Sequence, residues 1–154
     1  MPAPQLTSHD ATGHVHLIIG SNPLAGARCA KSLDVGARPI VVAPAELQPH
    51  YTLEKRIEEG KIEWLKRDFQ DDDLSNLGRE EVDGYVDAVF ITSDPRSAQA
   101  ARISSLCRRL RIPVNVVDSP NLSTFTLLST HSDGPLQIGI TLSLIHISEP
   151  TRPY

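Results

Sequence analysis

The sequence of 154 residues contains few cysteines and aromatic residues, no long apolar run and no excess of positive charge. A membrane-spanning helix needs about eighteen or more consecutive apolar residues, and no stretch of this chain approaches that length. The polar N-terminal sequence MPAPQLTSHDATG lacks the apolar core of a signal peptide. The net charge of -4 provides no basic surface for nucleic acid. We therefore predict a cytoplasmic protein that binds neither membranes nor nucleic acid.

Metal ligands are also sparse. The two cysteines, Cys29 and Cys107, fall in predicted helices, and neither has a second cysteine or a histidine at the spacing of a metal site. We expect both to be buried, reduced thiols. The acidic run Asp71 to Asp73 lies in a turn-rich stretch, and we interpret it as a solvated segment because most charge runs face water. The sequence thus predicts no metal site.

What the sequence does contain is a regular alternation of apolar and amphipathic segments between residues 14 and 141, after a polar leader at residues 1–13 that we expect to be flexible. Apolar runs predict strands at residues 15–19, 40–43, 61–66, 86–92, 114–117, 125–128 and 136–141, with a turn at Asp133-Gly134 joining the last two. Amphipathic stretches predict helices at residues 23–33, 47–59 and 95–111, and a short helix and loop within residues 67–84. This alternation is typical of an α/β domain with a doubly wound, mostly parallel sheet.

The helix predicted at residues 95–111 has the clearest apolar face. Its predicted inner residues are Ala98, Ala101, Ile103, Leu106, Cys107 and Leu110. Three arginines, Arg108, Arg109 and Arg111, lie near its C-terminal end, where positive charge complements the helix dipole. We interpret them as capping the helix and facing solvent rather than as an anion site.

The stretch VHLIIGSNPLAGARCAKSLDVGARPIVVAP predicts a strand, a tight turn, a helix and a second strand, a unit that commonly holds a nucleotide diphosphate at the helix N-terminus. A full dinucleotide fingerprint has glycine at three positions, which here are Gly20, Asn22 and Ala25. Asparagine accepts a positive φ, but we expect the Asn22 side chain to crowd a diphosphate. The second strand ends in VVAP, without the acid that usually binds ribose hydroxyls, which disfavours a generic dehydrogenase and a nucleotide sensor.

Ligands of a doubly wound sheet bind at the carboxyl ends of its strands, so the residues at those ends are the candidate site residues. They are Gly20, Ser21 and Asn22 in the first strand's turn, Ala43, Pro44 and Ala45 at the second, Thr92, Ser93 and Asp94 at the fourth, and Asp118 at the tip of the fifth with Asn115 nearby. Only the two aspartates are charged, and a carboxylate at this edge can act as a general base. The alternative is that Asp118, which precedes Ser119-Pro120, only initiates a turn.

The stretch quoted above, followed in order by EWLKRDF, AVFITSD, RIPVNVVDSPNLSTF and GPLQIGIT, resembles the NAD-dependent precorrin-2 dehydrogenase domain of siroheme synthases, in a fungal form. The resemblance covers nearly all of residues 14–141, and VNVVDSPNLSTF is its most specific part. It implies a Rossmann-like fold and the oxidation of precorrin-2 to sirohydrochlorin with NAD as acceptor. In some members iron insertion follows, which would make siroheme.

The resemblance also implies site residues. It assigns the family's catalytic aspartate to Asp118, the residue that the strand-end argument also selects. It places cofactor contacts at Pro23 and Leu24 and at Pro44 and Ala45. Together with the strand-end residues, the predicted cofactor-binding set is Gly20, Ser21, Asn22, Pro23, Leu24, Ala43, Pro44, Ala45 and Ser93. In the full-length protein the resemblance implies a homodimer.

The chain departs from the family pattern in its first turn. Many members have three successive glycines where this chain has Gly20-Ser21-Asn22, and the next residue, often acidic, is Pro23. A second hypothesis therefore keeps the fold without the chemistry, as a Rossmann module for dimerisation or scaffolding attached to a uroporphyrinogen methyltransferase. A regulatory nucleotide sensor is a third class, which the VVAP end of the second strand disfavours.

The C-terminal sequence departs more strongly. Residues 142–152, LSLIHISEPTR, resemble the in-frame translation of a sequencing adapter, so we predict that residues 142–154 are a non-native tail. His146 and Glu149 are therefore not treated as site residues. The family continues after this point with helices that form the dimer interface and one wall of the cleft. We expect the chain, truncated in this way, to bind NAD weakly at best and to turn over little precorrin-2.

Overall fold

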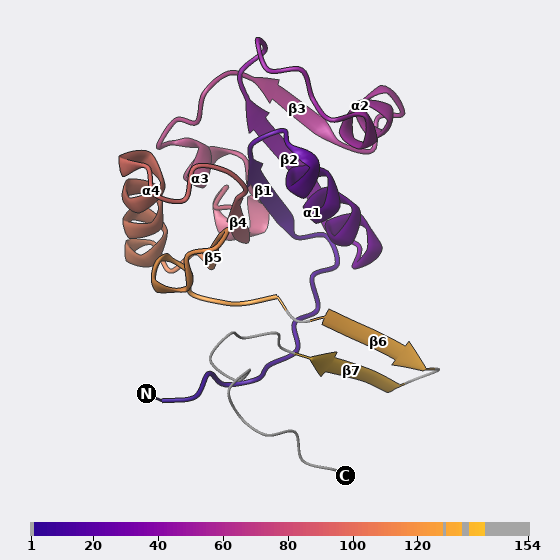
Figure 1. The fold of residues 1–154 in the computed structure, drawn as a ribbon, viewed down its shortest axis with the longest axis vertical. Coiled ribbons are helices and arrows are strands. Elements are labelled where there is room, and N and C mark those ends of the chain that lie inside the picture. The colour runs from indigo at the N-terminus through magenta and orange to yellow at the C-terminus, as the bar shows by residue number, and fades with distance from the viewer. Residues whose placement is uncertain (1, 128, 134–135, 141–154) are drawn as a thin grey trace. The chain divides into compact units, whose positions relative to one another are not determined.

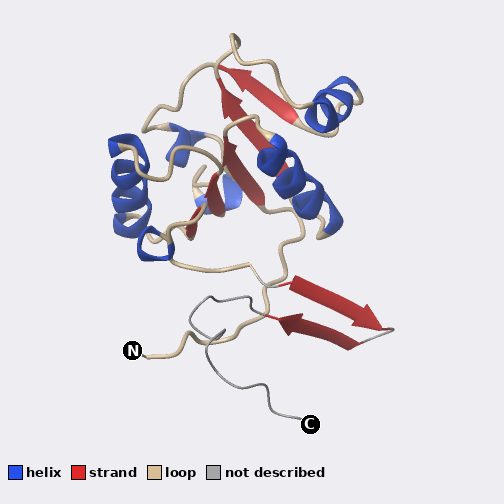
Figure 2. Ribbon diagram, viewed as in Figure 1, coloured by secondary structure: helices blue, strands red, loops and turns tan. Residues whose placement is uncertain are grey.

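The computed structural model describes residues 2–127, 129–133 and 136–140, and it divides into one unit of residues 1–124 and a second of residues 125–154. The first unit has five parallel strands in the order β3-β2-β1-β4-β5. Its elements are β1 (Val15–Ile19), α1 (Pro23–Asp34), β2 (Arg38–Ala43), α2 (Tyr51–Glu58), β3 (Glu63–Lys66), α3 (Asp73–Asn76), η1 (Glu80–Val82), β4 (Ala88–Ile91), α4 (Ala98–Arg109), β5 (Val114–Val116) and η2 (Pro120–Leu122). Helices α1 and α2 lie on one side of the sheet, and α3 and α4 lie on the other (Figures 1 and 2). The prediction of a doubly wound parallel sheet is confirmed.

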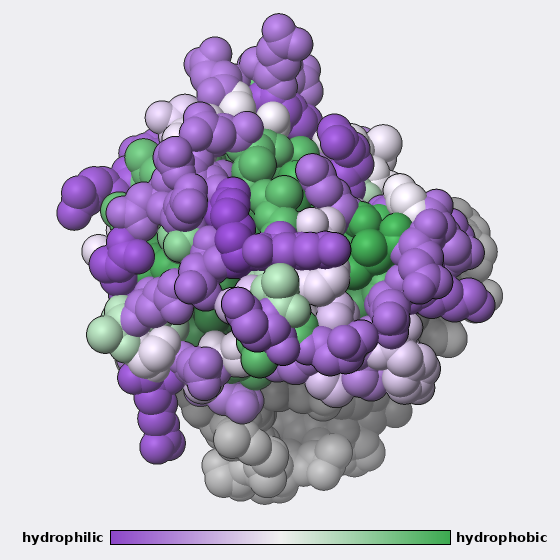
Figure 3. All heavy atoms as spheres, turned by 90° about the horizontal axis from the view of Figure 1, so that it is seen from above, coloured by the Kyte–Doolittle hydropathy of each residue, from purple (hydrophilic) through white to green (hydrophobic). Residues whose placement is uncertain are grey.

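The centre of the sheet is β1, which pairs with β2 on one side and β4 on the other. Leu17 lies opposite Ile40 in β2 and Val89 in β4, and all three side chains are buried. Continuous apolar strands are expected where helices cover both faces of a parallel sheet. Hydrophilic side chains cover much of the face seen in Figure 3, with apolar patches between them.

Local sequence signals set the ends of α1. Asn22 is its N-cap, and Pro23 occupies the first turn, where a missing N–H costs no hydrogen bond. After the helix ends at Asp34, Gly36 adopts a φ of 80°, a conformation that glycine accepts without strain. The helix thus begins and ends as the sequence predicts.

Helices α2 and α4 differ from their predicted extents. Helix α2 begins at Tyr51 rather than at residue 47, because His50 is its N-cap and accepts a hydrogen bond from the Thr52 amide at 3.4 Å. Helix α4 begins after Ser97, whose hydroxyl accepts a hydrogen bond from the Ala100 amide at 3.0 Å. In both segments a side-chain cap fixes the first turn later than the apolar pattern indicated.

The buried face of α4 also differs from the prediction. Its buried residues are Ala100, Ile103, Ser104 and Cys107, whereas Ala98, Ala101 and Leu110 are exposed. Ser104 can be buried because its hydroxyl donates a 2.6 Å hydrogen bond to the Leu122 carbonyl. The prediction rested on hydropathy alone, so it left this serine out of the inner face. It included the exposed residues Ala98, Ala101 and Leu110 instead.

The expected state of the cysteines is confirmed. Both Cys29 and Cys107 are free and buried. Burial raises the pKa of each thiol to about 12, because a thiolate would lose its hydration in the core. Neither thiol is suited to nucleophilic chemistry at neutral pH.

The prediction that the acidic residues 71–73 all face water is wrong for Asp73. Asp73 is only 3% exposed and accepts hydrogen bonds from both terminal nitrogens of Arg67, at 2.6 and 2.8 Å, and from the Gln70 amide at 2.9 Å. Within the described residues no group of three or more histidine, cysteine or acidic side chains is arranged to hold a metal ion. Nor is any described helix long and apolar enough to cross a membrane.

The outer edge of β5 is covered by hydroxyl side chains that follow η2. The Val114 amide donates to Thr124 Oγ1 at 2.9 Å, and the Val116 amide donates to Ser123 Oγ at 2.8 Å. The Thr124 amide in turn donates to the Val114 carbonyl at 2.7 Å. The polar backbone groups at this edge are therefore bonded without a sixth strand.

The second unit is an antiparallel pair of strands, β6 (Ser129–Asp133) and β7 (Leu136–Ile140), with Ser129 opposite Ile140. The strand predicted at residues 136–141 is confirmed as far as residue 140. The strand predicted at residues 125–128 is wrong for residues 125–127, since pairing begins at Ser129. The signal came from the apolar letters of FTLL, whereas the paired segment STHSD has no apolar alternation. Gly134 of the predicted turn and the predicted tail at residues 142–154 lie outside the described residues.

Candidate functional site

Three strands bring the predicted site residues to one edge of the sheet. The chain leaves the carboxyl end of β1 through α1 toward β2, while β4 lies on the other side of β1. The carboxyl ends of β1 and β4 therefore border a topological switch point, where ligands of doubly wound sheets bind. Strand β2 pairs with β1 on the side opposite to β4. Because the three strands are parallel, the residues predicted after β1, β2 and β4 lie at the same edge of the sheet.

Gly20 begins the turn after β1. Its φ is 121°, and its amide donates to the Val42 carbonyl at 3.0 Å. A Cβ atom at this position would lie 2.2 Å from Thr92 Oγ1, far inside contact distance. Both the backbone conformation and the neighbouring hydroxyl therefore require glycine here.

Asn22 does not use the positive φ that asparagine accepts: its φ is -79°, and it acts as the N-cap of α1. Its Oδ1 accepts a hydrogen bond from the Ala25 amide at 2.9 Å, and its Nδ2 donates to the Thr92 carbonyl at 2.9 Å. Both polar atoms of the side chain are thus used inside the turn. Asn22 serves to tie the start of α1 to the end of β4.

These contacts leave one amide of the first helical turn open. Pro23 has no N–H, the Ala25 amide binds Asn22 Oδ1, and the Gly26 amide binds the Asn22 carbonyl at 3.2 Å. Within the described part of the chain, the Leu24 amide has no hydrogen-bond partner. At a helix N-terminus such an N–H favours an anion. Leu24, one of the predicted cofactor contacts, supplies this donor.

The segment after β2 lies beside this turn. Ala43 is buried, Pro44 is half-buried and Ala45 is exposed, and none of them offers a carboxylate to a ribose. The His50 amide donates to the Ser21 carbonyl at 3.0 Å, which holds the segment against the first turn. The side chains at both strand ends are small and neutral, and Ser21 is buried like Ala43. Small side chains next to a strand–helix turn fit a dinucleotide.

Two contacts in this region were not predicted. Sequence reasoning missed His50 because its link to Ser21 uses a backbone amide. It also missed Trp64, whose indole N–H donates to the Ala43 carbonyl at 3.0 Å from the neighbouring strand β3. The apolar pattern of KIEWLK gave no sign of this contact, because it depends on how β3 is placed against β2.

The two aspartates predicted at strand ends share a conformation. Asp94 follows β4 with a φ of 50°, and Asp118 follows β5 with a φ of 54°. Aspartate tolerates this left-handed region better than most residues. Both are exposed, and the Asp118 carboxylate has no hydrogen-bond or ion-pair partner among the described residues. Ser93, the remaining predicted cofactor contact, precedes Asp94 in the chain and is half-buried.

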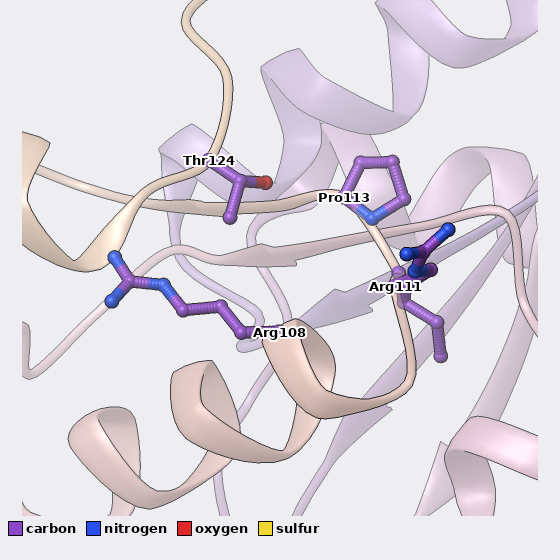
Figure 4. Close-up of a pocket in the computed structure, with 5 residues that line it drawn as sticks. Arg108, Arg111, Pro113 and Thr124 are labelled. Atoms are coloured by element: carbon purple, nitrogen blue, oxygen red, sulfur yellow. The ribbon is translucent and has the colours of Figure 1, made fainter.

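Two cavities of the described structure lie at the opposite edge. One, of about 220 Å³, is lined by Arg108, Arg111, Ile112, Pro113 and Thr124, next to the start of β5 (Figure 4). Figure 4 shows Arg108 and Arg111 extending in different directions from the end of α4. Arg108 is exposed, as predicted, but its guanidinium donates to the Asn121 carbonyl of η2 at 2.6 Å rather than to a carbonyl of its own helix. A second cavity adjoins the amino ends of β2 and β3.

Comparison with known proteins agrees with this geometry. A family model for putative NAD(P)-binding proteins matches residues 7–129. The chain is 35% identical to uroporphyrinogen-III C-methyltransferase of Saccharomyces cerevisiae over 150 residues, covering 90% of this chain and 25% of that protein. It is 30% identical to siroheme synthase of Pseudomonas aeruginosa over 133 residues, covering 86% of this chain and 26% of that protein. Siroheme biosynthesis protein met8 of Schizosaccharomyces pombe is 34% identical over 132 residues, covering 85% of this chain and 46% of that protein.

A solved structure has the same fold. SirC, a precorrin-2 dehydrogenase, superposes with a TM-score of 0.64 at 18% identity, covering 95% of this chain and 64% of that chain. The chain spans about a quarter of the length of the yeast methyltransferase and the bacterial siroheme synthase. The resemblance of residues 14–141 to siroheme synthases is thereby confirmed, and the chain belongs to the family of NAD(P)-binding domains whose model matches most of its length.

Proposed function

We propose that this domain binds NAD across the carboxyl edge of its sheet and oxidises precorrin-2 to sirohydrochlorin in siroheme biosynthesis. The observation that supports it most directly is the open Leu24 amide at the N-terminus of α1, next to the switch point between β1 and β4. The names of the siroheme synthase and met8 relatives support the choice of substrate.

The residues of the chain have distinct roles in this proposal. The Leu24 amide donates to a diphosphate oxygen, and Gly20 and Ser21 let the cofactor approach the backbone. Ala43, Pro44 and Ala45 line the adenosine end, and Ser93 lies on the side of β4. NAD supplies a hydride acceptor when bound.

Asp118 is the proposed acid–base residue. The oxidation removes the equivalent of a hydride, which leaves as NADH, and a proton, which a base must take. The exposed Asp118 carboxylate, which has no protein partner among the described residues, is available to accept that proton. Asp94, in the same backbone conformation at the end of the neighbouring strand β4, provides a matched comparison.

The experiment follows NADH formation from enzymatically generated precorrin-2, using both this chain and the complete gene product. We expect Asp118→Asn to lower turnover by about 100-fold or more while NAD affinity is kept. Asp94→Asn should leave both quantities close to the parent. Equal turnover of Asp118→Asn and the parent would refute the assignment of Asp118.

The second candidate is a non-catalytic module that serves an attached uroporphyrinogen methyltransferase. Two observations favour it: the yeast relative bears that name, and Leu24 alone among residues 23–26 has an amide without a partner in the described part of the chain. A folded, full-length parent that forms no NADH would support this candidate. The predicted homodimer and the predicted cytoplasmic location stay predictions.

A further inference from the structure

We propose that Thr92 is a positioning residue for the NAD site, although sequence reasoning did not include it among the cofactor contacts. Its hydroxyl and its carbonyl hold the turn between β1 and α1 in the conformation that presents the Leu24 amide. The inference rests on the proposed binding of NAD. Its test includes a measurement that does not depend on the cofactor.

Thr92 contacts both ends of this turn. It directly follows β4 and is 4% exposed. Its amide donates to the Ile19 carbonyl at 3.1 Å, and its Oγ1 donates to the same carbonyl at 2.9 Å. Its own carbonyl accepts a 2.9 Å hydrogen bond from Asn22 Nδ2. The residue after β4 therefore fixes the last residue of β1 and the N-cap of α1.

The hydroxyl also occupies the space that Gly20 leaves free. A Cβ at Gly20 would lie 2.2 Å from Thr92 Oγ1 and 3.6 Å from Thr92 Cβ. In a dinucleotide fingerprint this glycine is attributed to the tight turn. Here the contact with Thr92 gives a second reason for glycine, because the hydroxyl could not reach Ile19 past a methyl group.

The link to the cofactor passes through Asn22. Because its Nδ2 is held by Thr92, its Oδ1 is placed to cap the Ala25 amide, which sets where α1 begins. The position of the helix start determines the direction of the Leu24 N–H. Loss of the Thr92 hydroxyl removes one of the two hydrogen bonds that hold Thr92 to the Ile19 carbonyl. The Thr92 carbonyl and Asn22 should then shift more easily, which weakens the alignment of the open Leu24 N–H with a diphosphate.

The first test titrates the full chain with NADH and follows energy transfer from Trp64, the single tryptophan of the sequence. Its indole is bonded to Ala43 at the end of β2, next to the proposed adenosine contacts. We expect Thr92→Val to weaken NADH binding about tenfold, and Thr92→Ser, which keeps the hydroxyl, to stay within about twofold of the parent. Titrations at a temperature where every variant is folded keep lost stability out of the result.

Ser104→Ala is the matched control. It removes another buried hydroxyl that donates to a carbonyl, on α4 rather than at the nucleotide turn. We expect it to lower thermal stability about as much as Thr92→Val but to leave the NADH affinity unchanged. Equal affinities of Thr92→Val and the parent would overturn the inference, as would an equal loss of affinity in Ser104→Ala.

Amide hydrogen exchange separates this inference from the proposed function. We expect Thr92→Val to speed exchange of the Gly20 and Ala25 amides about tenfold relative to the parent and to Ser104→Ala. If the parent does not bind NADH but this exchange increases, the positioning role stands and the proposed cofactor is wrong. If the parent binds NADH and exchange and affinity are both unchanged, the positioning role is wrong and the proposed function stands.

Discussion

Replacing Gly20 by alanine tests the geometry of the nucleotide turn directly. The backbone φ of 121° disfavours any side chain, and we assign about 1 to 2 kcal/mol to that strain. The new Cβ would lie 2.2 Å from Thr92 Oγ1, so the hydroxyl must move and lose its bond to Ile19, a further loss of about 1 kcal/mol. The free energy of unfolding should therefore fall by about 2 to 3 kcal/mol.

Urea unfolding of four proteins measures this loss: the parent, Gly20→Ala, Thr92→Ala and the double variant. Thr92→Ala removes Oγ1 but keeps Cβ, which lies at an ordinary 3.6 Å from the position that the new methyl group would take. In that background Gly20→Ala should cost only its backbone strain, which gives a coupling energy of about 1 kcal/mol.

Gly60→Ala is the control for this experiment. Gly60 also has a positive φ, 78°, but nothing lies within 4 Å of its Cβ position. It should cost about 1 kcal/mol through the backbone alone. The reasoning is refuted if Gly20→Ala costs no more than Gly60→Ala, or if its cost is undiminished when Thr92 is alanine.

Two further predictions concern other parts of the fold. His16 is half-buried, and its Nδ1 lies 2.7 Å from Ser32 Oγ. Burial lowers the pKa of His16 in the folded protein below the ordinary value of 6.5. As the pH falls, the unfolded chain therefore takes up a proton at His16 before the folded chain does. Stability should be full above pH 6.5 and fall as the pH drops through the lowered pKa. Urea unfolding between about pH 8 and pH 5 should show a flatter profile for His16→Gln, and parallel profiles would contradict the assignment. Gly78→Ala would place a Cβ 1.8 Å from the Tyr85 carbonyl oxygen, a backbone atom that cannot rotate away, and should lower the free energy of unfolding by about 3 kcal/mol or more. A loss below about 1 kcal/mol in the same assay would show that the loop relaxes easily.

The strands and the nucleotide turn could be predicted because their signals are local. Apolar runs identified β1, β2, β4 and β5, and Pro23 and Gly36 marked the limits of α1. The predictions that were wrong concerned residues whose burial depends on contacts with other segments of the chain. Asp73 is buried because Arg67 forms an ion pair with it, and Ser104 faces the core because the Leu122 carbonyl accepts a hydrogen bond from its hydroxyl.

The candidate site divides in the same way. Gly20 was selected from the turn pattern, Leu24 through the family resemblance, and Asp118 from its place after a strand as well as from the resemblance. The contact of Thr92 with Gly20 depends on β4 lying next to β1, although 72 positions separate the two residues in the chain. A single sequence does not specify that adjacency, so Thr92, although one of the strand-end candidates, was not placed in the predicted cofactor-binding set.

The hydroxyl groups of Ser123 and Thr124 have a consequence for the behaviour of this domain in concentrated solution. An edge strand normally presents free amides to any other extended chain, and such edges promote aggregation. At β5 the amides of Val114 and Val116 are already bonded to these two side chains. A foreign strand would have to break both bonds before it gained any of its own, so this side of the sheet resists the edge-to-edge association that leads to aggregates.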